Sequence, residues 1–485
     1  MALPFLSRSH EAGIPSVSLR RILPDATFVG CRDLRVAGCS SDSRRIEPGQ
    51  VFVARRGETY HGLDFAAMAL ERGAVAVIAE EPRPEAGPLQ IIVANAPSAY
   101  ARIAQALAGS PSGEFPVIGI TGGAGKTAAA LFLRAILEAA GRRVGMISSS
   151  GWSDGARQYP GPFATSPSGL AGMLAAMAER RCEAGVMAVS AETLHQRATD
   201  GICVKSALVT SVRGVTPRPN RQVLARLVRQ VIPGGVVAVN GDDPDAAILS
   251  AVNLGAHPVT FGLGENFDIS ATIEECNLDG TRFRLRGFDR EARIQLRPLG
   301  ESVLMAALGA AAVARENGVV LDAVVAGLES VTQIPGRLER LARGAGRDVI
   351  ADRAWDGRSL RAALRTIRER TEGQVLCVLG ATADSSLAHE IAAVAEQESD
   401  RVFLTRASDA STGIDPEAWL AAMLRPGRVR ILLDRRKAIE AALDLSHPGD
   451  AVLLSGISPS PWGSDAEVAI GWFQTRESAP ARRSA

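Results

Sequence analysis

The sequence predicts an α/β protein with parallel sheets, and three observations support this fold class. Short apolar runs alternate with helical stretches along most of the chain, as expected when helices cover both faces of parallel strands. A length of 485 residues exceeds that of one ordinary domain. A glycine-rich turn links an apolar run at 115–120 to a helical stretch that starts at Ala128, which is the strand, loop and helix of a phosphate-binding site.

Three domains are expected from the distribution of these elements. Residues 1–112 predict a small α/β domain, residues 113–334 a central domain with a doubly wound sheet, and residues 335–475 a third α/β domain. Residues 476–485 predict a disordered tail. The strand candidates begin at Val51, Val75, Ile91, Val144, Ala184, Ala207, Val236, Val349, Val375, Val402, Val429 and Val452, and a weaker strand-rich stretch covers 257–297.

The composition is that of an ordinary soluble globular protein, with 46% hydrophobic and 22% charged residues. A net charge of +1 gives no electrostatic reason to expect binding to nucleic acid or to an anionic membrane. No apolar run reaches about 18 residues, and the start of the chain lacks the apolar core of a secretory signal, so we expect a cytoplasmic protein without a membrane span. The six cysteines show no C-x-x-C spacing, which favours free thiols.

The glycine-rich turn has the composition that phosphate binding requires. Glycines let backbone N–H groups face phosphate oxygens, and the N-terminus of the following helix adds the positive end of its dipole. Lys126 offers a positive charge to the terminal phosphates, and the Thr127 hydroxyl can ligate Mg²⁺. The alternative is a structural turn that happens to precede Lys-Thr. The expected nucleotide contacts in this stretch are Thr121, Gly122, Gly123, Ala124, Gly125, Lys126, Thr127 and Ala128, with Thr127 as the metal ligand.

Other polar residues follow strand candidates of the same central sheet. Ser190, Thr210–Ser211 and Asp242–Asp243 all come directly after such strands. Because ligands of open α/β sheets bind beyond the carboxyl ends of strands, we expect these residues near the phosphate-binding loop. The alternative for the two aspartates, which we favour, is a cap on a helix that begins near Pro244.

Several motifs resemble those of the Mur ligase family, and most closely its UDP-N-acetylmuramoyl-tripeptide synthetases. Residues 41–54 are similar to the D-S-R…P-G-x-L-F-V-A signature of that group, and Gly119–Thr127 is similar to its G-x-T-G-x-x-G-K-T. The segments that begin at Thr165, Asn240 and Pro335 resemble the family's T-T-P, N-x-D-D and P-G-R-x-E. The similarity covers about residues 15–460.

The resemblance implies the family's fold: a UDP-substrate domain, an ATPase domain and a dinucleotide-fold-like third domain. It implies ATP and Mg²⁺ as cofactors, and a UDP-N-acetylmuramoyl-peptide whose carboxylate is activated by ATP and joined to an amino acid during peptidoglycan precursor synthesis. Arg337, in the P-G-R motif, is expected to reach nucleotide phosphate. The residues that match family contacts to the UDP-linked substrate are Asp42, Ser43, Arg44, Thr165, Ser166, Ser190, Gln196 and Arg197.

Each of these substrate positions also has a structural alternative. Asp42 can cap a turn, and Thr165, Ser166 and Ser190 can be polar loop residues at the ends of strands. Gln196 and the arginine after it resemble a Q-x-R motif whose spacing is one residue short.

The metal-binding residues of the family are missing. Ala188 stands where the family has a metal-binding acid, and Glu192 where it has a histidine. Val215 and Thr216 take the Asp-His places of the family's D-H-L-D segment. No lysine occurs over residues 206–436, so the family's carbamylated lysine, which bridges metal ions, has no counterpart. A methyl group cannot ligate Mg²⁺, and arginine cannot replace a carbamylated lysine.

Motifs of the third domain are also changed. The family's D-Y-A-H begins here at Asp352 but lacks the histidine, and its glycine-rich G-x-G-G-D-R-D becomes the stretch from Gly380 to Ser386. The diaminopimelate-selecting D-N-P-R becomes Ala407-Ser-Asp-Ala. Asp352 without its histidine is as well suited to a helix cap or an ion pair as to catalysis.

These losses predict a nucleotide-binding pseudoenzyme related to the Mur ligases, with lost or altered ligase activity. One alternative is an active tripeptide-synthetase-type ligase, in which Glu192, Asp242 or Asp243 would hold the metal. A second alternative is a non-catalytic protein that pairs with an active ligase paralogue.

Overall fold

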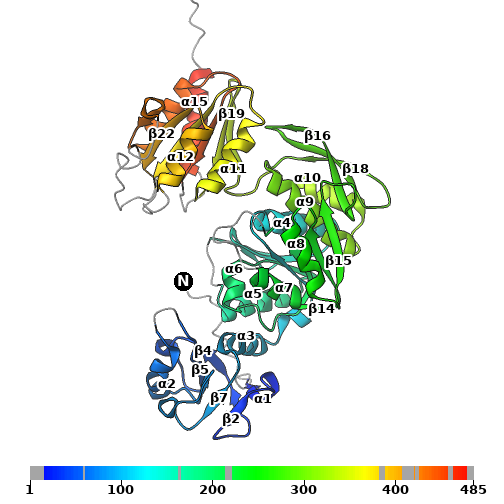
Figure 1. The fold of residues 1–485 in the computed structure, drawn as a ribbon, viewed down its shortest axis with the longest axis vertical. Helices are drawn as coiled ribbons and strands as arrows, with labels where there is room; N and C mark the ends of the chain where they lie inside the picture. Colours follow the sequence, from blue (N-terminus) through cyan, green and yellow to red (C-terminus); the bar gives the residue numbers. More distant parts are fainter. Residues whose placement is uncertain are drawn as a thin grey trace, which may run out of the picture. The chain divides into compact units, whose positions relative to one another are not determined.

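The chain folds into two compact units in a computed structural model (Figure 1). The first unit comprises Met1–Ile269 and Leu308–Gly327, and the second comprises Ser270–Ala307 and Leu328–Ala485. Val215, Thr216, Ala407 and residues 478–485 of the expected tail lie outside the described residues. The structure describes residues 16–57, 60–161, 165–212, 221–354, 356–381, 388–406, 420, 425–456 and 463–477.

The first unit begins with a five-stranded sheet in the order β2-β7-β6-β5-β4. Its strands β4 to β7 run parallel, and β2 is an antiparallel edge. Leu19 and Ile103 pack against one face, and Leu63 and Ala69 against the other, so both faces are covered by apolar side chains. The strands are β2 (Thr27–Val29), β4 (Gly38–Ser40), β5 (Gln50–Val53), β6 (Val77–Ala79) and β7 (Gln90–Ile92), and the helices are α1 (Leu19–Ile22), α2 (Ala66–Glu71) and α3 (Ala96–Leu107). A small antiparallel pair joins β1 (Val17–Ser18) to β3 (Arg35–Val36).

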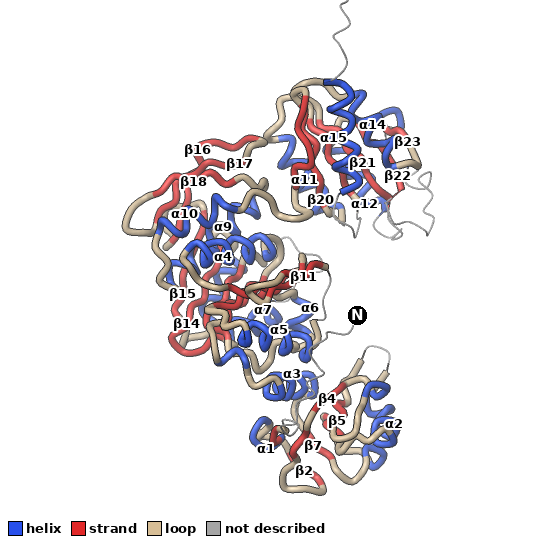
Figure 2. Tube along the Cα trace, turned by 180° about the vertical axis from the view of Figure 1, so that it is seen from behind, coloured by secondary structure: helices blue, strands red, loops and turns tan. Residues whose placement is uncertain are grey.

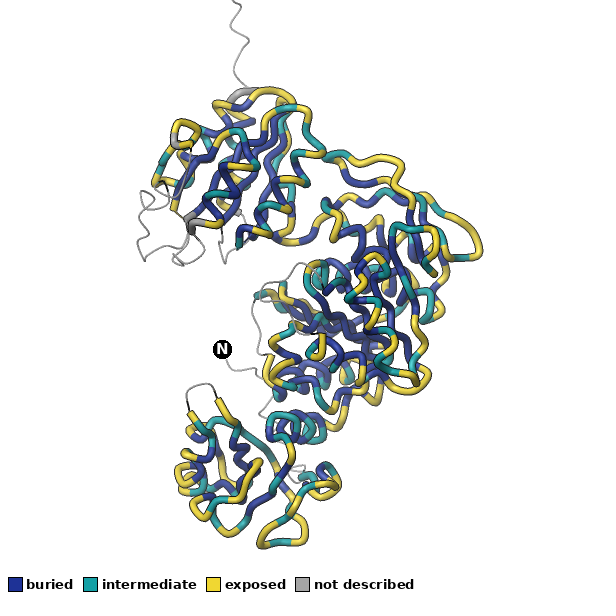
Figure 3. Tube along the Cα trace, in the orientation of Figure 1, coloured by how far each residue is buried: buried dark blue, intermediate teal, exposed yellow. Residues whose placement is uncertain are grey.

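The central sheet of the first unit has the order β11-β10-β9-β12-β8-β13-β14-β15. Figure 2 draws the strands of this unit in red and the helices around them in blue. The strands from β9 to β15 in this order are parallel, and β10 and β11 form an antiparallel hairpin at one edge. Strand β8 lies in the middle of this order and is buried along its length. Figure 3 shows the buried interior of the molecule in dark blue. The strands are β8 (Val117–Thr121), β9 (Val144–Ser148), β10 (Gly151–Ser153), β11 (Gln158–Pro160), β12 (Ala184–Ala188), β13 (Val204–Val209), β14 (Val231–Asn240) and β15 (His257–Gly262).

Helices cover both faces of this sheet. On one face, Leu174 and Leu224 pack into a single core with Val117 and Val209. On the other face, a Cβ added to Gly309 would meet the side chains of Leu208 and Phe261, so α9 lies directly on the strands. The expected doubly wound arrangement is therefore confirmed. The helices are α4 (Lys126–Ala139), α5 (Pro167–Glu179), α6 (Ala191–His195), α7 (Arg221–Arg229), α8 (Pro244–Ala247), α9 (Glu301–Glu316) and α10 (Leu321–Ser330).

The second unit contains an antiparallel three-stranded stretch and a six-stranded sheet. The six-stranded sheet has the order β19-β20-β24-β21-β22-β23, with every strand parallel except β19. Leu360 and Val394 belong to the core on one face, and Ile439 and Trp472 to the core on the other. The elements are β16 (Ile269–Asn277), β17 (Gly280–Arg286), β18 (Ala292–Leu296), β19 (Glu339–Gly344), β20 (Arg347–Asp352), β21 (Val375–Ala381), β22 (Arg401–Arg406), β23 (Val429–Ile431), β24 (Ala451–Ser455), α11 (Gly357–Arg368), α12 (Ala388–Glu398), α14 (Arg435–Leu445) and α15 (Gly463–Glu477).

The mixed α/β class with several parallel sheets is thus confirmed, while the domain boundaries at 112, 334 and 475 stay predictions. All six cysteines are free, as expected. Within the described part of the chain, no helix is both long and apolar enough to cross a bilayer.

Candidate functional site

The glycine-rich loop adopts a conformation that only glycine accommodates readily. Strand β8 ends at Thr121, and α4 begins at Lys126. Gly122 has φ 128° and Gly125 has φ 87°, in the left-handed half of backbone space. A Cβ on Gly122 would lie 2.5 Å from the hydroxyl oxygen of Thr210. The loop therefore sits tightly against the chain that follows β13.

Hydrogen bonds from the end of β13 fix the shape of this loop. The backbone N–H of Gly123 donates to the carbonyl of Ser211 at 2.8 Å, and the Thr210 hydroxyl donates to the carbonyl of Ala124 at 2.7 Å. The Lys126 ammonium donates to the carbonyls of Gly122 and Gly123 at 2.8 and 2.7 Å. A positive charge is thus held over the loop, at the N-terminus of a 14-residue helix.

Ser149 also lies beside the loop, although the sequence analysis did not predict a role for this residue. Its hydroxyl lies 2.9 Å from the hydroxyl of Thr127, the predicted metal ligand. Ser149 directly follows β9, in a run of three serines at 148–150. This run of serines after a predicted strand could have indicated the position of Ser149, because polar residues that follow parallel strands of one sheet lie at the same edge.

The end of β12 lies beside the loop but offers no acid there. Ala188 is in register with Ile120 of β8, so this methyl group occupies the place next to the phosphate-binding strand. Ser190 caps α6 by accepting a hydrogen bond from the Thr193 N–H at 3.0 Å. Glu192 is exposed, and its carboxylate accepts a hydrogen bond from the Gln196 side chain.

His195 is the last residue of α6, and Arg197 follows the C-cap of this helix. Arg197 forms an ion pair with Asp200 at 3.4 Å, and His195 is exposed.

The two aspartates after β14 accept hydrogen bonds from backbone N–H groups. One carboxylate oxygen of Asp243 accepts from the Asp245 N–H at 3.1 Å and caps α8, and the other accepts from the Val212 N–H at 2.7 Å. Asp242 accepts from the Leu263 N–H at 2.7 Å. The favoured interpretation of a helix cap is therefore confirmed for Asp243.

The candidate substrate residues of the N-terminal sheet occupy a short 3-10 turn. Asp42 caps this turn at Ser43–Arg45 and forms a 2.9 Å ion pair with Arg44. The hydrogen bond from the Arg44 side chain lowers the pKa of the Asp42 carboxyl below its usual value. Ser43 is buried, and its hydroxyl contacts the sulfur of Met68 at 3.5 Å. These contacts are those of the structural alternative, in which Asp42 caps a turn. They leave the Arg44 side chain largely exposed, at 78%.

Ser166 and Thr165 lie at the start of α5. Ser166 caps this helix by accepting from the Gly169 N–H at 3.2 Å, and Thr165 is exposed. Ser168, two residues further on, meets the hydroxyl of Tyr100 at 3.3 Å. The start of α5 is thereby tied to α3.

Arg337 and Asp352 both belong to the second unit. Arg337 is exposed on a turn that is closed by a bridge to Ile334. Asp352 is buried and accepts from the Leu338 N–H at 2.9 Å. Burial raises the pKa of the Asp352 carboxyl to about 6, against the opposing effects of the Arg337 charge and of backbone hydrogen bonds from Leu338 and Ala354.

We expect Asp352→Asn to remove a pH dependence of stability. Between pH 4 and 6, the folded chain holds a proton on Asp352 that the unfolded chain has released, so the wild type loses stability as pH rises through this window. The loss is on the order of 3 kcal/mol above pH 6. The amide still accepts the Leu338 N–H but carries no charge. Denaturation should show that the free energy of unfolding of Asp352→Asn, relative to the wild type, is higher at pH 7 than at pH 4. Asp289→Asn, at an exposed loop position, should show no such increase. Parallel curves for wild type and Asp352→Asn would contradict the prediction.

The residues around the loop fit a nucleotide phosphate chain, but they do not fit the metal centre of an ATP-dependent ligase. The narrow cradle at Gly122, the Lys126 ammonium and the N-terminus of α4 are suited to phosphate oxygens. Among the described residues, no group of three or more His, Cys, Asp or Glu side chains could hold a metal ion. Residues 162–164 and 213–220, which lie outside the description, contain none of these four residue types.

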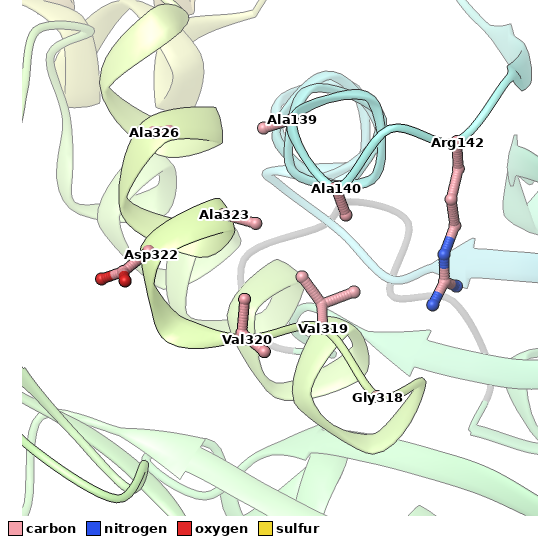
Figure 4. A pocket seen from close by; sticks show the side chains of 9 residues that line it. All are labelled: Ala139, Ala140, Arg142, Gly318, Val319, Val320, Asp322, Ala323 and Ala326. Atoms are coloured by element: carbon pink, nitrogen blue, oxygen red, sulfur yellow. The ribbon is translucent and has the colours of Figure 1, made fainter.

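A hollow elsewhere in the first unit lies at the opposite end of α4 from the loop (Figure 4). It has a volume of about 550 Å³ and is lined mainly by alanine and valine. Since α4 is 14 residues long, about 20 Å separate its two ends. This hollow is therefore not part of the phosphate site. Its lining consists of Ala139, Ala140, Arg142, Gly318, Val319, Val320, Asp322, Ala323 and Ala326.

A glycine-rich loop between a parallel strand and a helix, at the carboxyl edge of a doubly wound sheet, defines the class of phosphate-loop α/β proteins. Comparison with known families narrows this class. Models described as the Mur ligase family catalytic domain, the Mur ligase middle domain and the Mur ligase glutamate ligase domain match residues 35–108, 120–215 and 336–457. The chain belongs to the Mur ligase family.

Relatives match over nearly the whole chain. A UDP-N-acetylmuramoyl-L-alanyl-D-glutamate–2,6-diaminopimelate ligase of Geobacter sulfurreducens is 30% identical and covers 95% of this chain and 99% of its own. The enzyme of the same name from Mesorhizobium japonicum is 31% identical, with 87% and 90% covered. A UDP-N-acetylmuramyl-tripeptide synthetase of Roseiflexus is 29% identical, with 89% and 94% covered.

Solved structures support the fold. A structure of a UDP-N-acetylmuramoyl-L-alanyl-D-glutamate–2,6-diaminopimelate ligase superposes with a TM-score of 0.70 at 20% identity, over 96% of this chain and all of the other. A folylpolyglutamate synthase of Mycobacterium tuberculosis, complexed with ADP, gives a TM-score of 0.62 at 20% identity, over 77% and 93% of the two chains.

Proposed function

We propose that this protein is a cytoplasmic, ATP-binding member of the peptidoglycan precursor ligase family in which amide ligation is lost or altered. The observation that carries the proposal is an asymmetry at the carboxyl edge of the central sheet. The phosphate-binding loop is complete, while the neighbouring strand ends present Ala188 and two aspartates that bind backbone N–H groups.

The family's reaction explains why this asymmetry matters. Activating a carboxylate with ATP brings several negative charges together, and metal ions held by the protein stabilise that charge. Bound Mg²⁺ would supply this stabilisation, and Thr127 is the side chain that would contact it beside the loop. The chain's own residues, Lys126 and the N–H groups of the loop, grip and orient the phosphates. Binding is thereby supported more strongly than catalysis.

The relatives leave two further roles to test. Their names describe active ligases for UDP-N-acetylmuramoyl-peptides, so a tripeptide-synthetase-type activity is the second candidate. The exposed Arg44 guanidinium and the start of α5 are where such a substrate would be held. If binding without catalysis is the role, the partner to seek is an active Mur ligase paralogue.

We expect Lys126→Ala to weaken ATP binding by about 10- to 100-fold, because a charge-assisted hydrogen bond to phosphate contributes about 1.5–3 kcal/mol. Isothermal titration calorimetry measures the change. Lys437→Ala is the matched control, because it removes an exposed lysine from α14 in the second unit. Equal affinities in the wild type and Lys126→Ala would contradict nucleotide binding at the loop.

A separate assay tests the loss of ligation. Phosphate release is measured with ATP, UDP-N-acetylmuramoyl-dipeptide and a panel of amino acids. Little or no release above the ATP-only rate is expected. Release that requires both the dipeptide and one amino acid would establish the active ligase instead.

A further inference from the structure

The rim around the phosphate-binding loop is lined by hydroxyl groups. Thr127 and Ser149 face each other at 2.9 Å, and the Thr210 hydroxyl reaches the loop carbonyl of Ala124 at 2.7 Å. The hydroxyl of Ser211, which lies directly beneath the loop, is buried and has no hydrogen-bond partner. These groups come from the ends of two parallel strands, β9 and β13, and from the first turn of α4.

The carboxylates that follow strands at this rim are all engaged elsewhere. Both oxygens of Asp243 and one oxygen of Asp242 accept backbone N–H groups. Glu192 is exposed on α6 and accepts from Gln196. Residues 162–164 and 213–220, which lie outside the described part of the chain, contain no acidic residue. Among the described residues of this rim, Lys126 therefore supplies the positive charge, and the carboxylates accept hydrogen bonds from the protein itself.

This charge balance changes what the site requires of its ligand. In a metal-dependent site, protein carboxylates repel bare phosphates, and the cation turns that repulsion into attraction. A rim of hydroxyls and backbone N–H groups has no such repulsion to overcome. It can donate hydrogen bonds directly to phosphate oxygens, and the helix N-terminus adds to the attraction. Because the protein then offers a divalent cation few ligands, the cation adds little to the affinity for the nucleotide.

We propose that this site binds a nucleoside di- or triphosphate as the metal-free anion, so that Mg²⁺ is not needed for binding. This inference rests on the proposed nucleotide binding at the same loop and specifies the form of the ligand.

The decisive measurement is calorimetric titration of the full chain with ATP, once in excess EDTA and once in excess Mg²⁺, at equal ionic strength. The expected dissociation constants agree within about threefold. Binding that is more than tenfold tighter with Mg²⁺ would overturn metal-free binding while leaving nucleotide binding intact. Absence of heat in both conditions would overturn both proposals together.

Two variants at Ala188 sharpen the test. Ala188→Glu places a carboxylate at the strand position in register with Ile120, and Ala188→Gln adds nearly the same volume without charge. In EDTA, the glutamate variant should bind ATP about tenfold more weakly than the glutamine variant, and Mg²⁺ should restore much of that loss. Since the two variants differ in charge and hardly in size, a folding defect would affect both. Equal affinities of the two variants in EDTA would overturn the electrostatic argument.

Discussion

Replacing Gly122 with alanine should remove measurable nucleotide binding and destabilise the first unit by about 3 kcal/mol. The backbone of Gly122 has φ 128°, which an alanine adopts only under strain. The added Cβ would also lie 2.5 Å from the Thr210 hydroxyl oxygen and 2.7 Å from the Ser211 carbonyl oxygen. The second of these atoms is backbone and cannot turn away.

The loss of binding follows from the same contact. The Ser211 carbonyl accepts the Gly123 N–H at 2.8 Å, so pushing these atoms apart reorients the N–H groups that face the phosphates. Calorimetry with ATP and thermal unfolding together measure both effects.

Gly141 provides a matched control for the strain. It has φ 80°, and a Cβ there would meet nothing within 4 Å. Gly141→Ala should therefore cost about 1 kcal/mol and leave ATP affinity unchanged. Similar losses of stability in both variants would show that the tight approach of Gly122 to β13 does not determine the shape of the loop.

The strand-loop-helix order around Lys126 is the part of the site that sequence predicted best, because its pieces are adjacent in the chain. Strand, glycines and Lys126 follow one another within a dozen residues, and their order alone indicates the geometry. The helix cap at Asp243 was also favoured from sequence, since Pro244 follows it directly. Both features depend on neighbours in the chain, where spacing is informative.

The features that sequence did not reveal depend on strand order. Ser149 contacts Thr127 because the end of β9 lies beside the start of α4. The two residues are 22 positions apart in the sequence, and no local pattern encodes their contact. Strand β19 was missed because its sequence, Glu-Arg-Leu-Ala-Arg-Gly, alternates poorly and its pairing with β20 defines it. The Val212 N–H that engages Asp243 is likewise 31 residues away. Such long-range partners decide whether an acid is free to bind a metal.

Removing Arg435 should destabilise the second unit by about 3–5 kcal/mol, the largest loss of stability that we predict for a single side chain. Its guanidinium donates to both carboxylate oxygens of Asp465, from Nε at 3.0 Å and from Nη2 at 2.8 Å. The two side chains are only 10% and 7% exposed. The pair joins the first turns of α14 and α15.

In Arg435→Met, the Asp465 carboxylate stays buried without its counter-charge, and this accounts for most of the cost. Replacing both partners, as Arg435→Met with Asp465→Leu, should recover much of the stability because no uncompensated charge remains. The adjacent Arg436 is the control: its ion pair with Glu440 is exposed, so Arg436→Ala should cost about 0.3–0.5 kcal/mol. Denaturant unfolding followed by tryptophan fluorescence reports the second unit through Trp472 of α15. A loss of less than about 1 kcal/mol in Arg435→Met would mean that solvent reaches Asp465 and that the pair does not hold the two helices.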